Sequence, residues 1–158
     1  MRNGYEFVLD FLKKEGVEYN EDDKAIYFTF KSYAFSVIKK KSTELRVILW
    51  FRTSFESQDL LETCYLLNQR NKKDNKNIEY FVASNCNIGC IYYTDSCFSS
   101  DEINPIICRL NENRQAFLNE LMKQENDPNT RQQSISRDVM QKDEIEYNAS
   151  NEGLVDEL

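Results

Sequence analysis

The spacing of hydrophobic residues changes along this chain, and that change constrains the fold more than any other feature. Between Tyr5 and Leu12 the apolar residues recur every three or four positions, which is the spacing of one helix face. From residue 26 the spacing falls to two, and it holds over residues 26–30, 33–38 and 45–51. Because the side chains of a strand alternate between two faces, these three runs predict a meander of antiparallel strands.

Segments with helical spacing and segments with strand spacing occur again in the second half of the chain. Capping boxes, in which a Ser or Thr and a Glu three residues later satisfy the first backbone N–H groups, open helices predicted over residues 53–71 and 99–121. Between them, residues 78–83 and 88–94 alternate around a polar turn, which predicts a hairpin. The sequence therefore predicts an α+β fold: a five-stranded antiparallel sheet with elements in the order α-β-β-β-α-β-β-α.

Three local signals refine this fold. Asn3 and Glu6 form a further capping box at the start of the first helix, and Gly16 stands where that helix should end. In the run 45–51, Ile48 and Trp50 place apolar side chains on the second strand face as well. That strand is therefore expected to be central and covered on both sides.

The chain divides near residue 125 into a hydrophobic body and a polar tail. Residues 1–125 contain 17 basic and 19 acidic residues and 19 of the 20 aromatic residues. Residues 126–158 contain three basic and eight acidic residues and one aromatic residue. A segment with so little apolar surface cannot offset its own ordering entropy. We expect residues 1–125 to form a single domain and the tail to be flexible or docked onto it.

The absence of histidine excludes several kinds of chemistry at once. It removes Ser-His-Asp and Cys-His nucleophile pairs, HExxH zinc proteases, Cys2His2 fingers and imidazole pH switches. The five cysteines are odd in number and irregularly spaced, which favours free thiols in a reducing cytosol over a disulfide framework. We predict no catalytic, cofactor-binding or metal-binding residues.

Two clusters contain residue types that bind metal ions, and their spacing argues against an ion site at either one. On a continuous strand the sulfur atoms of Cys86 and Cys90 would lie about 13 Å apart, too far to share a zinc ion. A bend would shorten this distance, and Cys97 or Cys108 could add thiolates, but no Cys-x2-Cys pair exists. The acidic residues 21–23 lack the alternation and central Gly of a calcium loop. We interpret the thiols as core residues and the acidic run as a solvated turn before the first strand.

Charge and hydropathy limit the classes of partner. The net charge is −7 and the pI is about 4.8, whereas nucleic acids require a clustered basic surface. The longest apolar run, residues 47–51, has five residues, against the ~20 needed to span a bilayer. The N-terminus shows no secretory signal. We expect a cytoplasmic protein that binds neither nucleic acid nor membrane.

Polar residues on the predicted loops and helix ends allow two readings each. The basic clusters 39–41 and 70–76 could bind a small anionic ligand, although loop lysines more often serve solubility. Asn68 and Asn71 form a polar pair on an otherwise apolar helix face. Their amides are expected to bond helix-end carbonyls or the neighbouring loop, with a functional polar contact as the alternative.

The predicted sheet has more large apolar side chains than one face can bury. The surplus residues alternate with the core positions of their strands: Tyr27, Trp50, Phe81, Ile91 and Tyr93. We expect the first and last helices to cover one face and the middle helix part of the other. The remaining patch should contact a partner, most simply a second copy in a C2 dimer, or be covered by the tail.

Several motifs resemble those of a known family. Residues 11–19 read FLKKEGVEY, a helix that ends in Gly before the first strand, and residues 26–30 and 33–38 are the strands that follow. Residues 66–71, LLNQRN, are similar to the leucine-Asn-x-x-Asn end of that family's second helix. On these motifs residues 3–123 resemble the bacterial YbjN-like family, which has the type III secretion chaperone-like fold.

The resemblance implies a non-enzymatic protein with a convex helical surface and a concave sheet, and frequently a dimer. For the secretion chaperones it implies holding a partially unfolded client, and for YbjN-like proteins a regulatory role. The leading hypothesis is therefore a cytosolic protein-binding module with a protein client or regulatory partner. The alternatives are a small-ligand-binding or regulatory domain that uses the loop lysines, and an enzyme that works without histidine.

Overall fold

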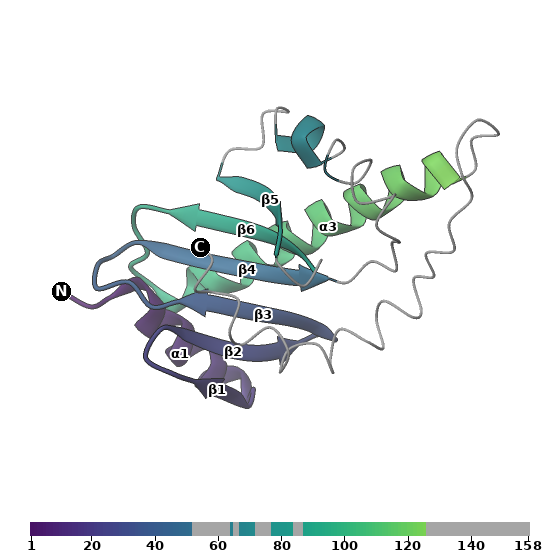
Figure 1. The fold of residues 1–158 in the computed structure, drawn as a ribbon. Helices are drawn as coiled ribbons and strands as arrows, with labels where there is room; N and C mark the ends of the chain where they lie inside the picture. The colour runs from purple at the N-terminus through teal and green to yellow at the C-terminus, as the bar shows by residue number, and fades with distance from the viewer. Residues whose placement is uncertain (52–63, 65–66, 72–76, 84–86, 126–158) are drawn as a thin grey trace.

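The computed structural model describes residues 1–51, 64, 67–71, 77–83 and 87–125, with side chains through residue 120. In this part of the chain, six strands form one antiparallel sheet in the order β1-β2-β3-β4-β6-β5 (Figure 1). The strands are β1 (Tyr19–Glu21), β2 (Ala25–Phe30), β3 (Tyr33–Ile38), β4 (Leu45–Phe51), β5 (Ile78–Val82) and β6 (Ile88–Thr94). The predicted α+β class and antiparallel sheet are confirmed, but the predicted number of five strands is wrong.

The strand missing from the prediction is β1, which pairs with β2 at the edge of the sheet. Its three residues include a single apolar side chain, so they produce no recognisable alternation. Glu21 ends this strand, and the Asp22 carboxylate accepts the backbone N–H groups of Lys24 and Ala25 at 2.8 Å each. The acidic run interpreted as a solvated turn is therefore the end of a strand and the turn of a hairpin.

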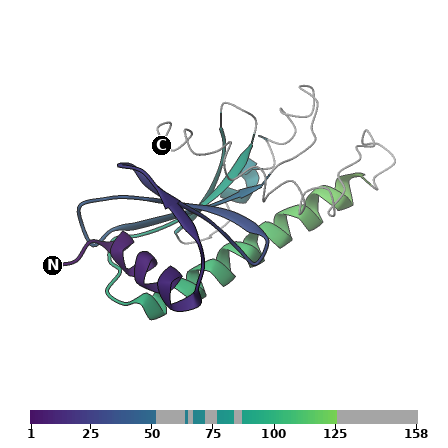
Figure 2. The same ribbon diagram turned by 90° about the horizontal axis from the view of Figure 1, so that it is seen from below.

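Both long helices lie on the same side of the sheet. They are α1 (Gly4–Glu15) and α3 (Ile103–Glu125), the second preceded by the short turn η1 (Ser100–Glu102). Figure 2 shows both helices below the strands. No helix in the described part of the chain has the length and hydrophobicity needed to cross a bilayer.

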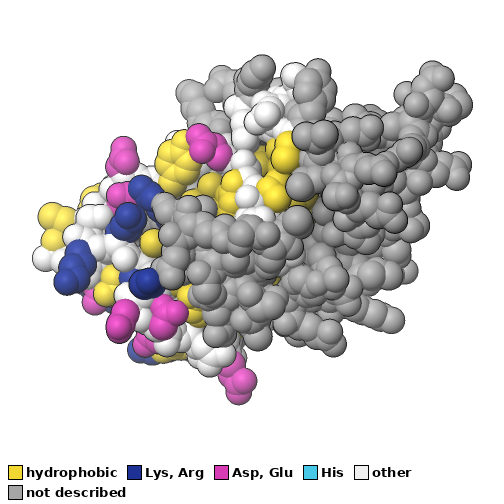
Figure 3. Space-filling view, in the orientation of Figure 1, with side chains coloured by type: hydrophobic (Ala, Val, Ile, Leu, Met, Phe, Trp, Pro, Cys, Tyr) yellow, Lys and Arg dark blue, Asp and Glu magenta, His cyan; other side chains and the backbone are white. Residues whose placement is uncertain are grey.

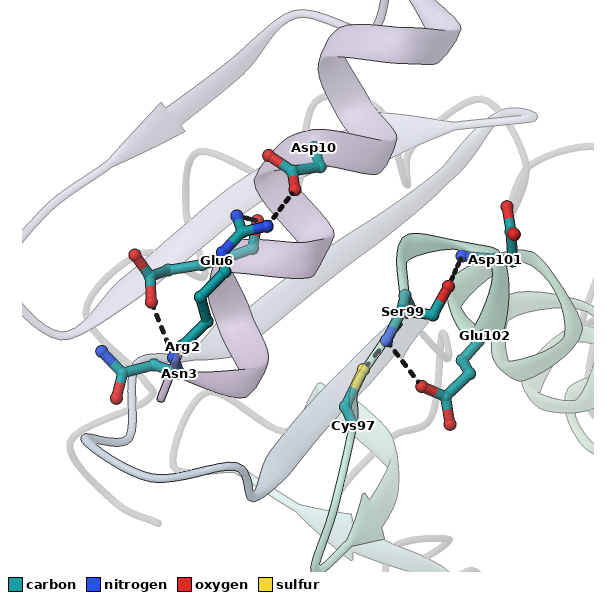
Figure 4. A network of polar contacts seen from close by, with 8 residues as sticks. All are labelled: Arg2, Asn3, Glu6, Asp10, Cys97, Ser99, Asp101 and Glu102. Atoms are coloured by element: carbon teal, nitrogen blue, oxygen red, sulfur yellow. Dashed lines mark hydrogen bonds and ion pairs between the residues drawn. The ribbon is translucent and has the colours of Figure 1, made fainter.

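The helix ends follow the sequence signals. The backbone N–H of Asn3 donates to Glu6 Oε2 at 2.6 Å, and that of Ser99 donates to Glu102 Oε2 at 2.9 Å (Figure 4). Two of the three predicted capping boxes are thus confirmed, and the third, at residue 53, lies outside the described residues. Gly16 ends α1 with a φ of 67°, in the left-handed region that favours glycine.

The register divides the strand side chains into two faces, which we call the helix-side face and the far face. Phe35 pairs with Leu49, which pairs with Cys90, and these residues belong to the large core beneath the helices. One position along, Ala34 pairs with Trp50, which pairs with Gly89 on the far face. As predicted, β4 is central and its residues are buried on both faces.

Several predicted features lie wholly or partly outside the described residues. They are most of the helix 53–71, Cys86 with its turn, and the tail 126–158. Of that helix, Leu67 is buried in the core of the helix-side face. The described end of the middle helix therefore packs on the same side as α1 and α3, and not on the far face as expected.

Candidate functional site

The far face contains a pocket of about 310 Å³ at the end of the sheet formed by β4, β6 and β5. Its lining combines aromatic, aliphatic and charged residues: Arg46, Glu79, Tyr80, Phe81, Ile91 and Tyr93. We call it the far-face pocket. On this side of the molecule, hydrophobic side chains lie beside acidic and basic ones (Figure 3).

The strand register brings the lining residues together. Arg46 of β4 pairs with Tyr93 of β6, and Ile91 of β6 pairs with Glu79 of β5. Cross-strand partners point to the same face of a sheet, and so do residues two apart on one strand. Phe81 therefore stands beside Glu79, and Ile91 beside Tyr93, on one continuous surface.

The floor of the pocket depends on Gly89. A Cβ atom at this position would overlap the Phe81 ring, so the ring lies directly over the glycine backbone. Phe81 also meets Trp50 edge-on, with ring centroids 5.4 Å apart and planes at 82°. The glycine therefore leaves room for an aromatic ring that is only partly buried.

Two interactions set the charges at the rim of the pocket. The Tyr93 hydroxyl donates to Glu79 Oε1 at 3.1 Å, and this hydrogen bond raises the pKa of Tyr93. The phenol therefore remains a protonated donor at neutral pH. Arg46 Nε lies 2.6 Å from Glu44 Oε1, so the guanidinium is paired with the carboxylate of the residue that immediately precedes β4.

Three of the five residues predicted to contact a partner line this pocket: Phe81, Ile91 and Tyr93. Tyr93 is 38% exposed, whereas Tyr27 and Trp50 are 2% and 1% exposed. The two buried side chains have partners for their polar atoms. The Tyr27 hydroxyl donates to Asp22 at 3.0 Å, and Trp50 Nε1 donates to the Ser36 hydroxyl at 2.8 Å. The candidate site therefore does not include Tyr27 or Trp50.

Asn71 binds the outer edge of β5. Its side-chain amide donates to the Tyr80 carbonyl at 3.0 Å, and its oxygen accepts the Tyr80 N–H at 2.8 Å. These bonds go to a strand rather than to the helix end or loop expected from the sequence. They occupy backbone groups that an added strand would need. Asn68 is exposed on the same helix.

Some of the other candidate groups from the sequence are held in structural contacts. Lys39 forms an ion pair with Glu21 at 2.9 Å, and Arg70 forms one with Glu120 at 3.0 Å. The remaining basic residues of the second cluster lie outside the described part. Burial raises the pKa of Cys90 to about 12 and that of Cys97 to about 11. These two thiols are therefore neutral at physiological pH and poor nucleophiles.

The described potential metal ligands do not gather into a cluster. In residues 1–51, 64, 67–71, 77–83 and 87–120 no three His, Cys, Asp or Glu side chains lie close enough together to hold an ion. Cys90 and Cys97 are buried while Cys108 is exposed. Cys86 lies outside the described residues, so its distance from Cys90 stays a sequence-based expectation.

Sequence reasoning did not single out Arg46 and Glu79. Both are charged residues within apolar strands. Glu79 lies two positions before Phe81, and Arg46 lies four positions before Trp50, so each shares a strand face with a predicted contact residue. That alternation was a usable signal. What the sequence could not supply was the strand order, which places β6 between β4 and β5 and so brings Arg46 and Glu79 to the same pocket.

Comparison with known proteins finds a likeness in fold. Among solved structures the chain is similar to the crystal structure of YbjN, a proposed transcription regulator from E. coli, with a TM-score of 0.55 and 9% sequence identity. The match covers 73% of this chain and 88% of that one. No family model and no curated protein matches the sequence. The YbjN-like fold expected from the sequence is therefore confirmed, as a likeness in fold alone.

Proposed function

We propose that this chain is a non-enzymatic protein-binding module that holds a segment of a partner protein in the far-face pocket. The observation that carries this proposal is the pocket itself, where Phe81, Ile91 and the exposed Tyr93 stand together on a sheet. Aromatic residues of this kind are enriched at protein interfaces, because each combines a large apolar area with few rotatable bonds. The charged Arg46 and Glu79 supply the polar rim that such interfaces have.

The size of the pocket favours side chains over a large ligand. Small-molecule sites usually occupy about 300–1,000 Å³. A volume of about 310 Å³ is at the lower end of that range and suits one or two side chains of a peptide. Cys90 and Cys97 are candidate nucleophiles, but their thiols are buried and neutral. They therefore give little support to the alternative of a histidine-free enzyme.

A protein is a better candidate partner than nucleic acid. The fold is shared with a protein described as a proposed transcription regulator, which agrees with a binding or regulatory role. The net charge of −7, however, opposes contact with phosphates. We therefore propose regulation through a protein partner, in the cytoplasm, with a homodimer as one form that partner could take.

Capture of partners from native cell extract tests the proposal. Full-length wild type, Tyr93→Ser and Phe98→Ser would be immobilised, and the retained proteins identified and quantified. Phe98 is 64% exposed and lies in the loop after β6, so it serves as a matched control for losing an exposed aromatic ring. We expect Tyr93→Ser to retain at least about tenfold less of the specific partner, since truncating an interface hot-spot residue costs about 2 kcal/mol or more and a tenfold change corresponds to about 1.4 kcal/mol.

The outcomes separate clearly. Normal capture by Phe98→Ser together with loss in Tyr93→Ser supports the pocket as the binding site. Equal capture by all three proteins contradicts it, and equal loss in both variants indicates non-specific adhesion of exposed rings. Light scattering on the same samples shows whether the retained partner is a second copy of the chain.

A further inference from the structure

We infer that the side chain received by the far-face pocket is a basic one, an arginine or lysine of the partner protein. This inference rests on the proposed function and specifies its partner. The aliphatic stem would lie against Phe81 and Ile91. The cationic head would lie between the Tyr93 ring and the Glu79 carboxylate.

The charges of the pocket give the first argument. Arg46 is paired with Glu44, so its charge is already balanced. In the described part of the chain, the Glu79 carboxylate accepts one hydrogen bond, from the neutral Tyr93 hydroxyl, and forms no ion pair. The three charged groups sum to −1, and the chain as a whole carries −7. The pocket therefore attracts a cation and repels a carboxylate.

The aromatic rings give the second argument. This fold already places cations over its own rings elsewhere: the Arg114 guanidinium lies 4.6 Å from the Tyr33 centroid, and that of Arg2 lies 4.6 Å from the Phe7 centroid. Among the described residues, neither Phe81 nor Tyr93 has a cation over its ring. A ring face beside a carboxylate is a favourable site for a Lys or Arg head group.

An acidic partner is the competing occupant, because Arg46 also lines the pocket. An incoming carboxylate would meet a guanidinium whose charge Glu44 already balances through a contact of 2.6 Å at Nε, and it would also meet the negative charge of Glu79 in the same pocket. Both features oppose its binding. A basic side chain meets neither obstacle, so the observed pairing favours the cation.

Three model peptides test the inference on the full-length protein. They are acetyl-Gly-Arg-Gly-amide, the same peptide with norleucine, which keeps the stem without the charge, and the same peptide with Glu. Binding is followed at millimolar concentrations by the backbone amide NMR shifts of β5 and β6. We expect the arginine peptide to bind at least about fivefold more tightly than the norleucine peptide. Added salt should reduce that preference.

Two variants identify the group responsible. Glu79→Gln keeps an acceptor for the Tyr93 hydroxyl and removes the charge, so the arginine peptide should fall to the affinity of the norleucine peptide. Glu112→Gln makes the same change at an exposed position on α3 and should leave the preference intact.

The possible outcomes distinguish failure of the basic partner from failure of the proposed function. Equal affinity for the arginine and norleucine peptides overturns the basic partner but leaves the apolar pocket as a binding site. Preference for the glutamate peptide also overturns it and assigns recognition to Arg46. Absence of saturable shifts at β5 and β6 with every peptide overturns the basic partner and also contradicts the proposed function.

Discussion

The helix-side face and the far face belong to the same strands, yet their side chains differ in kind. On the helix-side face, Phe35 and Leu49 are fully buried in one large core, together with Phe117 of α3. The far face alternates small residues such as Ala34 with Trp50, and its buried cluster is much smaller. It also carries the Trp50–Ser36 hydrogen bond and the partly exposed rings of the pocket.

This difference separates stability from recognition. Apolar burial beneath α1 and α3 supplies most of the driving force for folding, because it removes the larger apolar area from water. A ring that remains partly exposed, such as Tyr93, contributes less to folding and stays accessible to a partner. The two faces should therefore respond differently to the same kind of substitution.

The largest expected effect is on the helix-side face. Phe117 is fully buried and contacts Phe51 and Tyr80 with ring centroids 5.6 and 5.4 Å away. Phe117→Ala should lower the free energy of unfolding by about 3–5 kcal/mol. Phe81→Ala, at a partly buried position on the far face, should lower it by only about 1–2 kcal/mol. Urea denaturation measures both, and equal losses would contradict the division between the faces.

An intermediate effect is expected at the floor of the pocket. Gly89→Ala places a methyl group where the Phe81 ring lies, so the ring must move and about 1–3 kcal/mol of stability should be lost. The fluorescence of Trp50, the single tryptophan, should change because its ring meets Phe81 edge-on.

The control for Gly89→Ala is the same substitution made in Phe81→Ala. Without the ring the added methyl group has room, so most of the cost should disappear. If the cost of Gly89→Ala were unchanged in that background, the ring would not be what Gly89 accommodates.

The smallest effect on stability is expected from a substitution in a turn, which alters neither face of the sheet. Lys31 and Ser32 connect β2 and β3 with φ values of 51° and 69°, as in a type I′ turn, where Gly is preferred. Ser32→Gly should raise stability by at most about 1 kcal/mol, or roughly 2–4 °C in melting temperature, without changing Trp50 fluorescence. Ser96→Gly, at a position without a positive φ, should not stabilise the protein. Stabilisation by both changes would exclude backbone strain as the cause.

Much of the fold could be predicted because local signals and packing agree. The capping boxes at Asn3 and Ser99 and the alternation of β2, β3 and β4 each indicated the element that forms. The three residues of β1 could not be predicted, because their pairing depends on the adjacent β2 and on the Asp22 turn rather than on a hydrophobic pattern.

The candidate site was only partly predictable for a related reason. Phe81, Ile91 and Tyr93 could be identified as surplus apolar residues from alternation alone. Alternation does not tell which surplus residues remain accessible, so Trp50 was grouped with Tyr93 although their exposures are 1% and 38%. The Glu79–Tyr93 hydrogen bond depends on the register of the β5–β6 hairpin, and Arg46 reaches the same pocket because β6 lies beside β4, an order that no local pattern specifies.

The central claim is that Tyr93 serves binding and contributes little to folding. The most direct measurement is the amount of partner that Tyr93→Ser captures relative to wild type at equal concentration of folded protein, with the folded fraction taken from urea denaturation of each sample. We predict an unfolding free energy close to that of wild type and at least about tenfold less captured partner. Undiminished capture by the folded variant, or a loss of capture that only follows its unfolding, would contradict the claim.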